Sequence, residues 1–341
     1  MRRLPLGIAL LLAGCATPVA SPPLENVPVP AVAETEPVAS ADDAADDPAI
    51  WRNPRDPARS LVVATDKQAG IHVYDLAGKR LSYTPAPRLN NVDLREAGGR
   101  IIVAASDRAD EAQAHVSLFE LDSATARLRT LGRFPVGAGE AYGMCLWTRA
   151  RDHALFGFVV LKDGRIDQVS IEATSSGMVV RTVRSMKLGT QSEGCVVDDR
   201  TGQLYVAEED VGLWRFAADP AAPTTPISIA RVDGRTLVAD AEGLALAPAG
   251  KRGGYLVVSS QGDNAYTLYR LPDVRYAGRF RIGGGAIDGT SETDGIDLML
   301  GNFGPAFSAG LMVAQDGDNA PATQNFKYVS WAAVRRALHF N

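Results

Sequence analysis

The sequence predicts an all-β fold, a six-bladed β-propeller, from three observations. Helical periodicity is nearly absent outside the N-terminal segment and WAAVRRAL near the C-terminus. A short apolar strand preceded by a polar or acidic residue recurs as DDPAIW, NNVDLR, AYGMCL, SEGCVV, AEGLAL and TDGIDL. In one register, successive copies lie 44, 51, 51, 49 and 52 residues apart, counted at Asp47, Asn91, Tyr142, Glu193, Glu242 and Asp294. Units of roughly 40 to 50 residues built of short strands are typical of propeller blades.

Within each unit the first strand is followed by a second strand that ends in charged residues, and then by further strands. VVATDKQAGIHVYDL in the first unit and YVAEEDVGLWRF in the fourth show this pattern, with Gly and Asp at the turns. Such runs predict three or four antiparallel strands per unit. The sixth unit has only three clear strands before the chain ends, so we expect the segment near Glu34–Val38 to pair with it and close the ring.

The first fifteen residues, MRRLPLGIALLLAGC, have the layout of an export signal, with a basic start, a short apolar run and small residues before Cys15. LAGC resembles a bacterial lipobox, which would make Cys15 a lipidated N-terminus; an ordinary signal with a chance cysteine is the alternative. The chain then divides into a signal (1–15), a flexible tether (16–32) and a propeller domain (33–341). The expected location is the periplasm or cell surface, with an outer-membrane anchor through Cys15.

Composition limits the partners of the protein. Of 341 residues, 46% are hydrophobic and 22% charged, which is enough for a large core. Without Arg2 and Arg3 the 35 basic residues fall to 33 against 40 acidic ones, which argues against nucleic acid as a partner. After removal of the signal, Cys145 and Cys195 could pair in an oxidising compartment, but we expect two buried thiols. We also expect a monomer.

Acidic residues gather where the repeat brings strands together. In a propeller the first strands line the central channel, so residues in register form a ring at one mouth. Asp47, Glu193, Glu242 and Asp294 belong to this ring. Converging carboxylates without a His or Cys cluster suit a hard divalent cation, above all calcium. Asp46 and Asp47 are therefore predicted metal ligands, although any single acid could merely cap a turn.

Basic residues follow the second strands of the first three units, at Lys67, Arg108 and Lys162. One side of the rim is thus expected to be cationic and the other to bind calcium. This combination suits a ligand rich in phosphate, because Lys and Arg bind phosphate oxygens while metal ions neutralise them.

Longer motifs follow one another along the chain: AETEPV (33–38), DDPAIW (46–51), NNVDLR (90–95), SEG (192–194), AEEDVGLW (207–214), EGL (242–244), SSQGDN (259–264), DGTSETDGID (288–297), AQDGDN (314–319) and QNFK (324–327). In their order and spacing they resemble the motifs of a known family, the β-propeller phytases. The resemblance implies a phosphoric monoester hydrolase of the 3-phytase type. Such an enzyme hydrolyses phytate, myo-inositol hexakisphosphate, and depends on several calcium ions.

The resemblance also implies roles for individual residues. A structural calcium site that fastens the last blade would use Asp288, Gly289, Asp316 and Asp318. Another, which clips blade 1 to blade 2, would use Asp47 and the backbone of Val92. Channel and active-site calcium ligands would be Glu193, Glu208, Asp240, Glu242 and Gln261, with Asp46 and Glu34 near the same cluster. Substrate phosphates would bind Lys67, Arg108, Tyr142 and Lys162. The family often has a second lysine where this chain has Gln68.

These parts predict direct attack by a water that calcium activates at Glu208, Glu193 and Asp46, while Lys67, Arg108 and Lys162 hold the developing charge. No covalent phosphoenzyme is expected, because the four histidines form no RHG motif and neither Cys145 nor Cys195 opens a Cys-x5-Arg loop. A non-catalytic propeller and a calcium-binding propeller of the lactonase kind are the alternatives. The cationic half of the rim favours the phytase.

Overall fold

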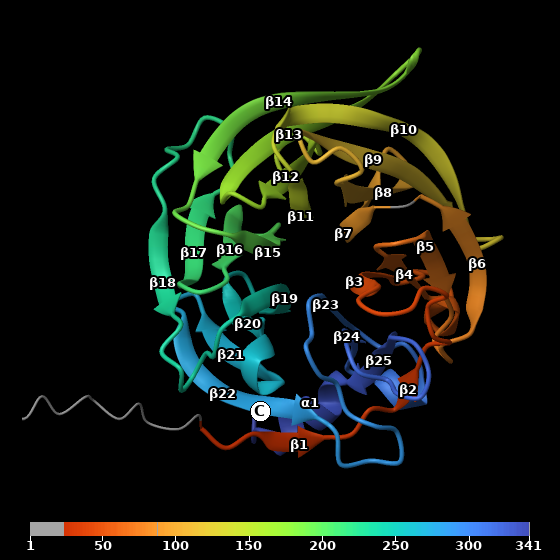
Figure 1. The fold of residues 1–341 in the computed structure, drawn as a ribbon, viewed down its shortest axis with the longest axis vertical. Helices are drawn as coiled ribbons and strands as arrows, with labels where there is room; N and C mark the ends of the chain where they lie inside the picture. The colour runs from red at the N-terminus through yellow and green to blue at the C-terminus, as the bar shows by residue number, and fades with distance from the viewer. Residues whose placement is uncertain (1–23, 87, 341) are drawn as a thin grey trace, which may run out of the picture.

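The computed structural model describes residues 24–86 and 88–340. Six sheets stand around a central channel, as Figure 1 shows, and the predicted six-bladed propeller is confirmed. The predicted signal, Cys15 and the first part of the tether lie outside the described residues. No helix within the described ranges is long and apolar enough to cross a membrane.

Blades 1 to 3 follow the chain in order, each with its first strand innermost. Blade 1 contains β3 (Ala45–Trp51), β4 (Leu61–Asp66), β5 (Gly70–Tyr74) and β6 (Arg80–Pro85). Blade 2 contains β7 (Leu89–Ala97), β8 (Arg100–Asp107), β9 (Gln113–Asp122) and β10 (Arg127–Ala138). Blade 3 contains β11 (Ala141–Thr148), β12 (Leu155–Leu161), β13 (Arg165–Thr174) and β14 (Gly177–Lys187).

Blades 4 to 6 continue the arrangement, and the last two receive strands from the N-terminus. Blade 4 contains β15 (Ser192–Asp198), β16 (Gln203–Glu208), β17 (Gly212–Ala217) and β18 (Ile227–Arg231). Blade 5 contains β19 (Ala241–Ala249), β20 (Gly253–Ser260), β21 (Ala265–Leu271), β22 (Arg275–Ile282) and β1 (Val27–Val29). Blade 6 contains β23 (Ile296–Leu300), β24 (Gly310–Asp316), β25 (Asn325–Ser330) and β2 (Ala33–Glu34).

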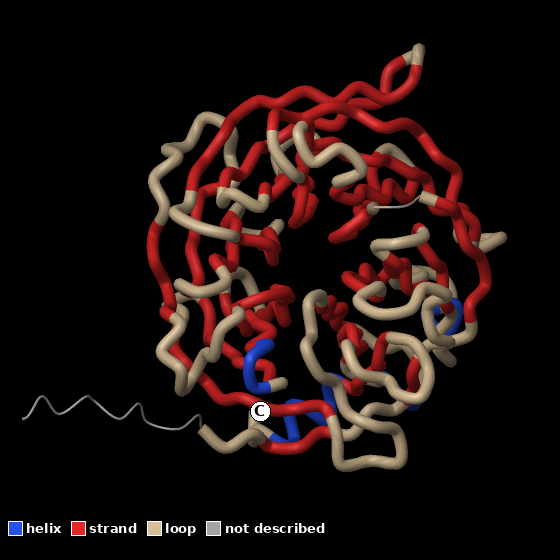
Figure 2. The backbone as a smooth tube through the Cα atoms, in the orientation of Figure 1, coloured by secondary structure: helices blue, strands red, loops and turns tan. Residues whose placement is uncertain are grey.

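Within the described residues, helical structure is confined to short segments, as the colouring of Figure 2 shows. The predicted C-terminal helix is present as α1 (Trp331–Ala337). Single 3-10 turns occupy η1 (Pro57–Arg59), η2 (Gln261–Asp263) and η3 (Pro305–Phe307).

The N-terminal segment closes the ring, as the short sixth unit predicted. β2 pairs antiparallel with β25, with Glu34 opposite Lys327. The Thr35 N–H donates to the Phe326 carbonyl at 2.9 Å, and the Val38 N–H donates to that of Gln324, also at 2.9 Å. β1 precedes this contact and runs parallel to β22. One end of the chain therefore supplies the outer strand that the other end lacks.

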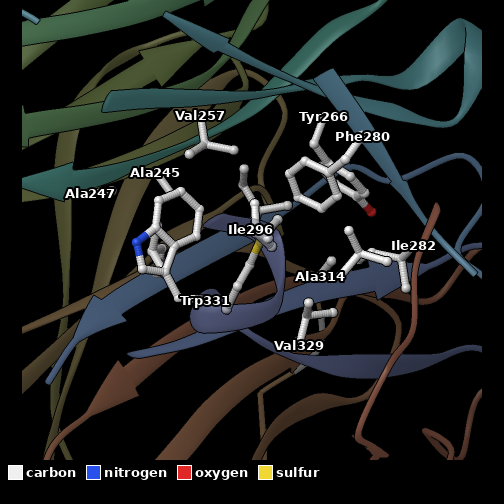
Figure 3. Packing of buried hydrophobic residues seen from close by; sticks show 14 of the residues in the cluster. Ala245, Ala247, Val257, Tyr266, Phe280, Ile282, Ile296, Ala314, Val329 and Trp331 are labelled. Carbon is white, nitrogen blue, oxygen red and sulfur yellow. The ribbon is translucent and has the colours of Figure 1, made fainter. Parts of the chain in front are cut away.

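Burial explains why the inner strands show no regular alternation of apolar and polar residues. Every residue of β3, β4 and β5 is buried, whereas β6 alternates between partly buried and exposed positions. Inner strands are covered by neighbouring blades on both faces, so alternation is lost there. The same packing forms the clusters between blades. Figure 3 shows the one between blades 5 and 6, where Trp331 of α1 joins Ile296 and Val257.

The expectation of two buried thiols is wrong, because Cys145 and Cys195 form a disulfide with their Cα atoms 5.8 Å apart. Cys145 lies on β11 and Cys195 on β15, the inner strands of neighbouring blades. Adjacent inner strands approach closely, and this brings together two cysteines separated by 50 residues in sequence.

Candidate active site

The polar residues that open the inner strands meet at one mouth of the channel. In five of the blades the inner strand carries a β-bulge at this point, for example between Ala45 and Pro48 in blade 1. A bulge leaves a residue unpaired and redirects its side chain. Asp47, Glu193 and Glu242 are all buried there.

Glycine follows the polar residue in four blades because adjacent inner strands leave no room for a side chain. A Cβ atom on Gly143 would lie 1.9 Å from the Glu193 carbonyl oxygen, and one on Gly194 would lie 2.3 Å from that of Glu242. Gly243 meets the next blade in the same way. The recurrent polar-glycine pair therefore marks a ring of backbone contacts around the channel mouth.

Three carboxylates from blades 4 and 5 form a buried acidic cluster. Glu193, Glu209 and Glu242 each place an oxygen within 4.8 Å of the others. Among the described residues, Glu209 Oε1, Glu242 Oε2 and the neighbouring Asp46 Oδ2 are buried without a hydrogen-bond donor. Unpaired buried carboxylate oxygens are costly unless a proton or a cation compensates them. This donor set fits a divalent cation that prefers oxygen ligands.

Burial and mutual repulsion favour protonation of these acids when no cation is bound. Burial, and then the charge of Asp46, raise the pKa of Glu193 well above its ordinary value. Burial, and then the charge of Glu193, also raise the pKa of Glu242 well above its ordinary value. Burial raises the pKa of Glu209 to about 7, with Asp240 contributing. A bound cation would reverse this effect, because it stabilises the ionised carboxylates.

Glu208, a predicted ligand, does not join this cluster. Its Oε1 accepts hydrogen bonds from the Thr190 N–H at 2.7 Å and the Thr190 hydroxyl at 2.8 Å. Its Oε2 accepts one from Trp214 Nε1 at 2.6 Å. Successive side chains at a strand end point to opposite sides, so the adjacent Glu209 faces the channel instead. Sequence reasoning therefore missed Glu209 by one position.

The repeat itself contained the signal that identifies Glu209. In five blades, the residue immediately after the second strand donates its N–H to a carbonyl just ahead of the inner strand. The five donors are Lys67, Arg108, Lys162, Glu209 and Gln261. Glu209 is thus the counterpart of the predicted cationic residues. Glu208 is the counterpart of Asp66 and Asp107, the last residues of the second strands in blades 1 and 2.

Tyr142 lies beneath two of the predicted cations. The Arg108 guanidinium carbon is 5.6 Å from the centre of the Tyr142 ring, and Lys162 Nζ is 5.2 Å from it. The charge of Glu193, and then burial, raise the pKa of Tyr142, so its hydroxyl stays protonated. The structure thus brings together three of the four predicted phosphate-binding residues.

Lys67, the fourth, faces carboxylates. Its Nζ lies 2.7 Å from Asp43 Oδ1, 3.0 Å from Asp294 Oδ2 and 3.4 Å from Asp46 Oδ1. Although burial lowers the pKa of Lys67, Asp46 and Asp294 raise it overall. Lys67 therefore stays charged and connects the cationic side of the rim to the acidic side.

Gln68 holds the loop that carries Asp43. Its Nε2 donates to the carbonyl oxygens of Ala41 and Asp43, both at 2.9 Å. The residue that replaces a lysine of the resembled family thus orders the loop above Lys67.

The remaining predicted ligands are distributed over several places. Asp47 Oδ2 accepts a hydrogen bond from the Val92 N–H at 3.0 Å, which joins blades 1 and 2 directly. Gln261 Nε2 donates to Asp294 Oδ1 at 2.8 Å. Asp240 and Asp318 line the cavity over the channel mouth. Gly289 lines a different cavity.

Lys327 occupies the centre of the predicted structural calcium site. Its buried Nζ lies 2.5 Å from Asp288 Oδ1, 2.6 Å from Glu34 Oε2 and 3.2 Å from Asp316 Oδ2. Glu34 therefore pairs with this lysine rather than with the acidic cluster. One ammonium group faces three carboxylates here, so the group of side chains keeps a net negative charge, and among the described residues no donor hydrogen-bonds to the buried Asp316 Oδ2.

A cavity of about 720 Å³ opens over the channel mouth and joins the two sides of the site. Lys67 and Tyr142 line it opposite Glu209 and Glu242. The cavity thus offers a lysine, a tyrosine and metal-competent carboxylates to one ligand.

Fold and site together define a propeller hydrolase suited to phosphorylated ligands, and comparison with known proteins gives its family. The family model described as Phytase matches residues 6–341, so the chain belongs to the phytase family and is an enzyme of that family. It is 41% identical to the 3-phytase of Bacillus subtilis (strain 168) over 327 residues, 91% of this chain and 85% of the relative. A chain in the crystal structure of the mitotic checkpoint complex is 12% identical to this chain. The alignment covers 96% of this chain and 87% of that chain, with a TM-score of 0.46.

Proposed function

We propose that the chain is a calcium-dependent phytase that releases phosphate from myo-inositol hexakisphosphate by direct attack of water. One observation carries the proposal: the acidic cluster Glu193, Glu209 and Glu242 shares a mouth of the channel with Tyr142 and its two cations. The family membership and the 3-phytase relative support the same activity.

The cationic residues bind and orient the substrate. Arg108 can grip two oxygens of one phosphate, because its guanidinium is planar and presents parallel donors. Lys162 is 43% exposed and can reach a second oxygen or a neighbouring phosphate. The Tyr142 ring fixes the direction from which Arg108 and Lys162 approach a phosphate, and this reduces the conformational entropy lost on binding.

Glu193, Glu209 and Glu242 would hold the calcium, with Asp46 beside them. Calcium supplies Lewis-acid charge to phosphoryl oxygens and activates water as a nucleophile. The three glutamates are buried, so little bulk water would compete with them for the cation. Arg108, Lys162 and Lys67 stabilise the negative charge that develops on the transferred phosphoryl group.

Phosphate release from phytate tests the proposal. Purified protein should release phosphate in calcium and lose activity in excess chelator, with recovery when calcium is restored. Arg108→Ala should raise KM and lower kcat/KM by a factor on the order of 100, since a charged contact is worth about 2 to 3 kcal/mol. Arg181→Ala, on the outer strand of blade 3, is the matched control. Chelator-resistant activity would overturn the calcium dependence.

Export and anchoring remain part of the proposal. Cys15 would carry the lipid, and the propeller would act outside the cytoplasm. Cell fractionation of wild type and Cys15→Ser tests this: the variant should leave the membrane fraction, and equal membrane association of both would refute the anchor.

A further inference from the structure

Glu140 is an acidic residue on the cationic side of the site. It immediately precedes β11, and its Oε1 lies 3.6 Å from Arg108 Nη1 while its Oε2 lies 3.9 Å from Lys162 Nζ. Each of the two cations that lie on the Tyr142 ring thus faces its own oxygen of the Glu140 carboxylate. Its side chain is 18% exposed, so the charge is only partly screened by water.

The contact of Glu140 with the two cations is electrostatic and imposes little geometry. Both distances exceed that of a normal hydrogen bond. By comparison, Arg88 and Glu111 approach to 2.6 Å elsewhere on the described surface. The backbone keeps Glu140 in place, because the Lys162 N–H donates to its carbonyl oxygen at 3.1 Å. The Tyr142 ring positions the cations independently of the carboxylate.

We propose that Glu140 is a specificity-determining residue that limits how tightly Arg108 and Lys162 hold a single phosphate group. This inference rests on the proposed function. A phosphate dianion would meet two positive charges, and the single negative charge of Glu140 already balances one of them. The Glu140 carboxylate would also repel the dianion. Affinity would then require several phosphate groups on one molecule, each with its own contacts. Inorganic phosphate, the product, would bind weakly and leave.

Binding of inorganic phosphate to three variants tests this role. Glu140→Gln keeps the shape and removes the charge, whereas Glu140→Asp keeps the charge and shortens the side chain. Glu172→Gln is the matched control, because Glu172 pairs with Arg181 at 3.4 Å in the same blade but away from the cavity. Calorimetric titration gives Kd, and steady-state assays give KM and kcat for phytate.

E140Q should bind inorganic phosphate roughly three- to tenfold more tightly, as expected for one charge at a few ångströms in a partly screened site. The difference should shrink as ionic strength rises. KM for phytate should fall in the same variant. E140D and E172Q should stay within about twofold of wild type, because neither changes the charge beside Arg108 and Lys162.

Unchanged or weaker phosphate binding by E140Q would overturn the proposal. Equal effects of E140Q and E140D would also overturn it, because they would show a packing role instead of a charge effect. Glu140→Asn provides the same loss of charge if E140Q folds poorly, as judged by its melting temperature. Wild-type protein that releases no phosphate from phytate would refute the proposed function, whereas an active wild type with an unaltered E140Q refutes only the role of Glu140.

Discussion

The sulfur atoms of Cys145 and Cys195 are bonded to each other, so β11 of blade 3 is covalently tied to β15 of blade 4. Cys195 lies two residues beyond Glu193 on the same strand, and the bond therefore adjoins the acidic cluster. A link between inner strands resists separation of two blades at the centre of the ring.

Replacing both cysteines should lower the stability of the fold. The bond closes a loop of 50 residues, which corresponds to about 4 kcal/mol in the chain-entropy model. We expect the double variant Cys145→Ala, Cys195→Ala to lose about 2 to 4 kcal/mol in free energy of unfolding, measured by chemical denaturation. Reductant should shift the midpoint of wild type and leave the double variant unaffected. Equal midpoints for both proteins would contradict the stabilising role.

Substitution at Glu209 and at Glu208 should have different consequences. Glu209→Gln removes a ligand charge from the cluster, so kcat should fall by a factor on the order of 100 or more while the melting temperature in chelator changes little. Glu208→Gln disturbs the hydrogen bonds to Thr190 and Trp214, and should cost about 1 to 3 kcal/mol in stability. Phosphate-release assays and thermal melts of both variants distinguish the two roles. Equal loss of kcat in two folded, equally stable variants would show that Glu208 also acts in the chemistry.

Lys327→Met should destabilise the closure of the ring. Removing the ammonium leaves Glu34, Asp288 and Asp316 facing each other, and breaking the buried pair of Lys327 with Asp316 should cost about 3 kcal/mol. Denaturation in chelator measures the loss. Added calcium should restore part of it, because the freed carboxylates could then bind a cation.

Lys187→Met is the control for this variant, since Lys187 is 54% exposed and pairs with Asp163 on the surface. It should change stability by less than about 1 kcal/mol. A K327M protein as stable as K187M would show that the lysine does not hold the N-terminal strand.

Asp297 should make stability depend on pH. It is partly buried near the opposite mouth of the channel, and burial, with the charge of Asp93, raises its pKa to about 7 from an ordinary value of 3.8. Between these values the folded state binds more protons than the unfolded state, so the free energy of unfolding falls as pH rises. The slope from this residue is at most about 1.4 kcal/mol per pH unit.

Asp297→Asn removes this titration while keeping an acceptor for the Ile50 N–H, which donates to Asp297 Oδ2 at 2.8 Å. Relative to this variant, wild type should lose stability between about pH 4 and pH 7. Denaturation series at constant calcium measure the difference. A difference that is flat, or that grows in favour of wild type with pH, would contradict the raised pKa.

The sequence by itself determined the number of blades, their boundaries and the ring at the channel mouth. Each blade repeats the same backbone contacts with its neighbour, so the polar residue and the glycine after it recur at a nearly constant interval. The positions of Lys67, Arg108 and Lys162 followed from the same register, because equivalent strand ends face the same side of a propeller.

Only the tertiary structure decided which side chains meet. Glu208 and Glu209 are adjacent and chemically alike, and the direction of each is fixed by Thr190, Trp214 and the neighbouring blade. Lys327 and Glu34 are 293 residues apart and become partners only when the ring closes. The disulfide likewise depends on how closely two inner strands approach. Such contacts join segments far apart in the chain, and a local pattern of residue types does not specify their distance or direction.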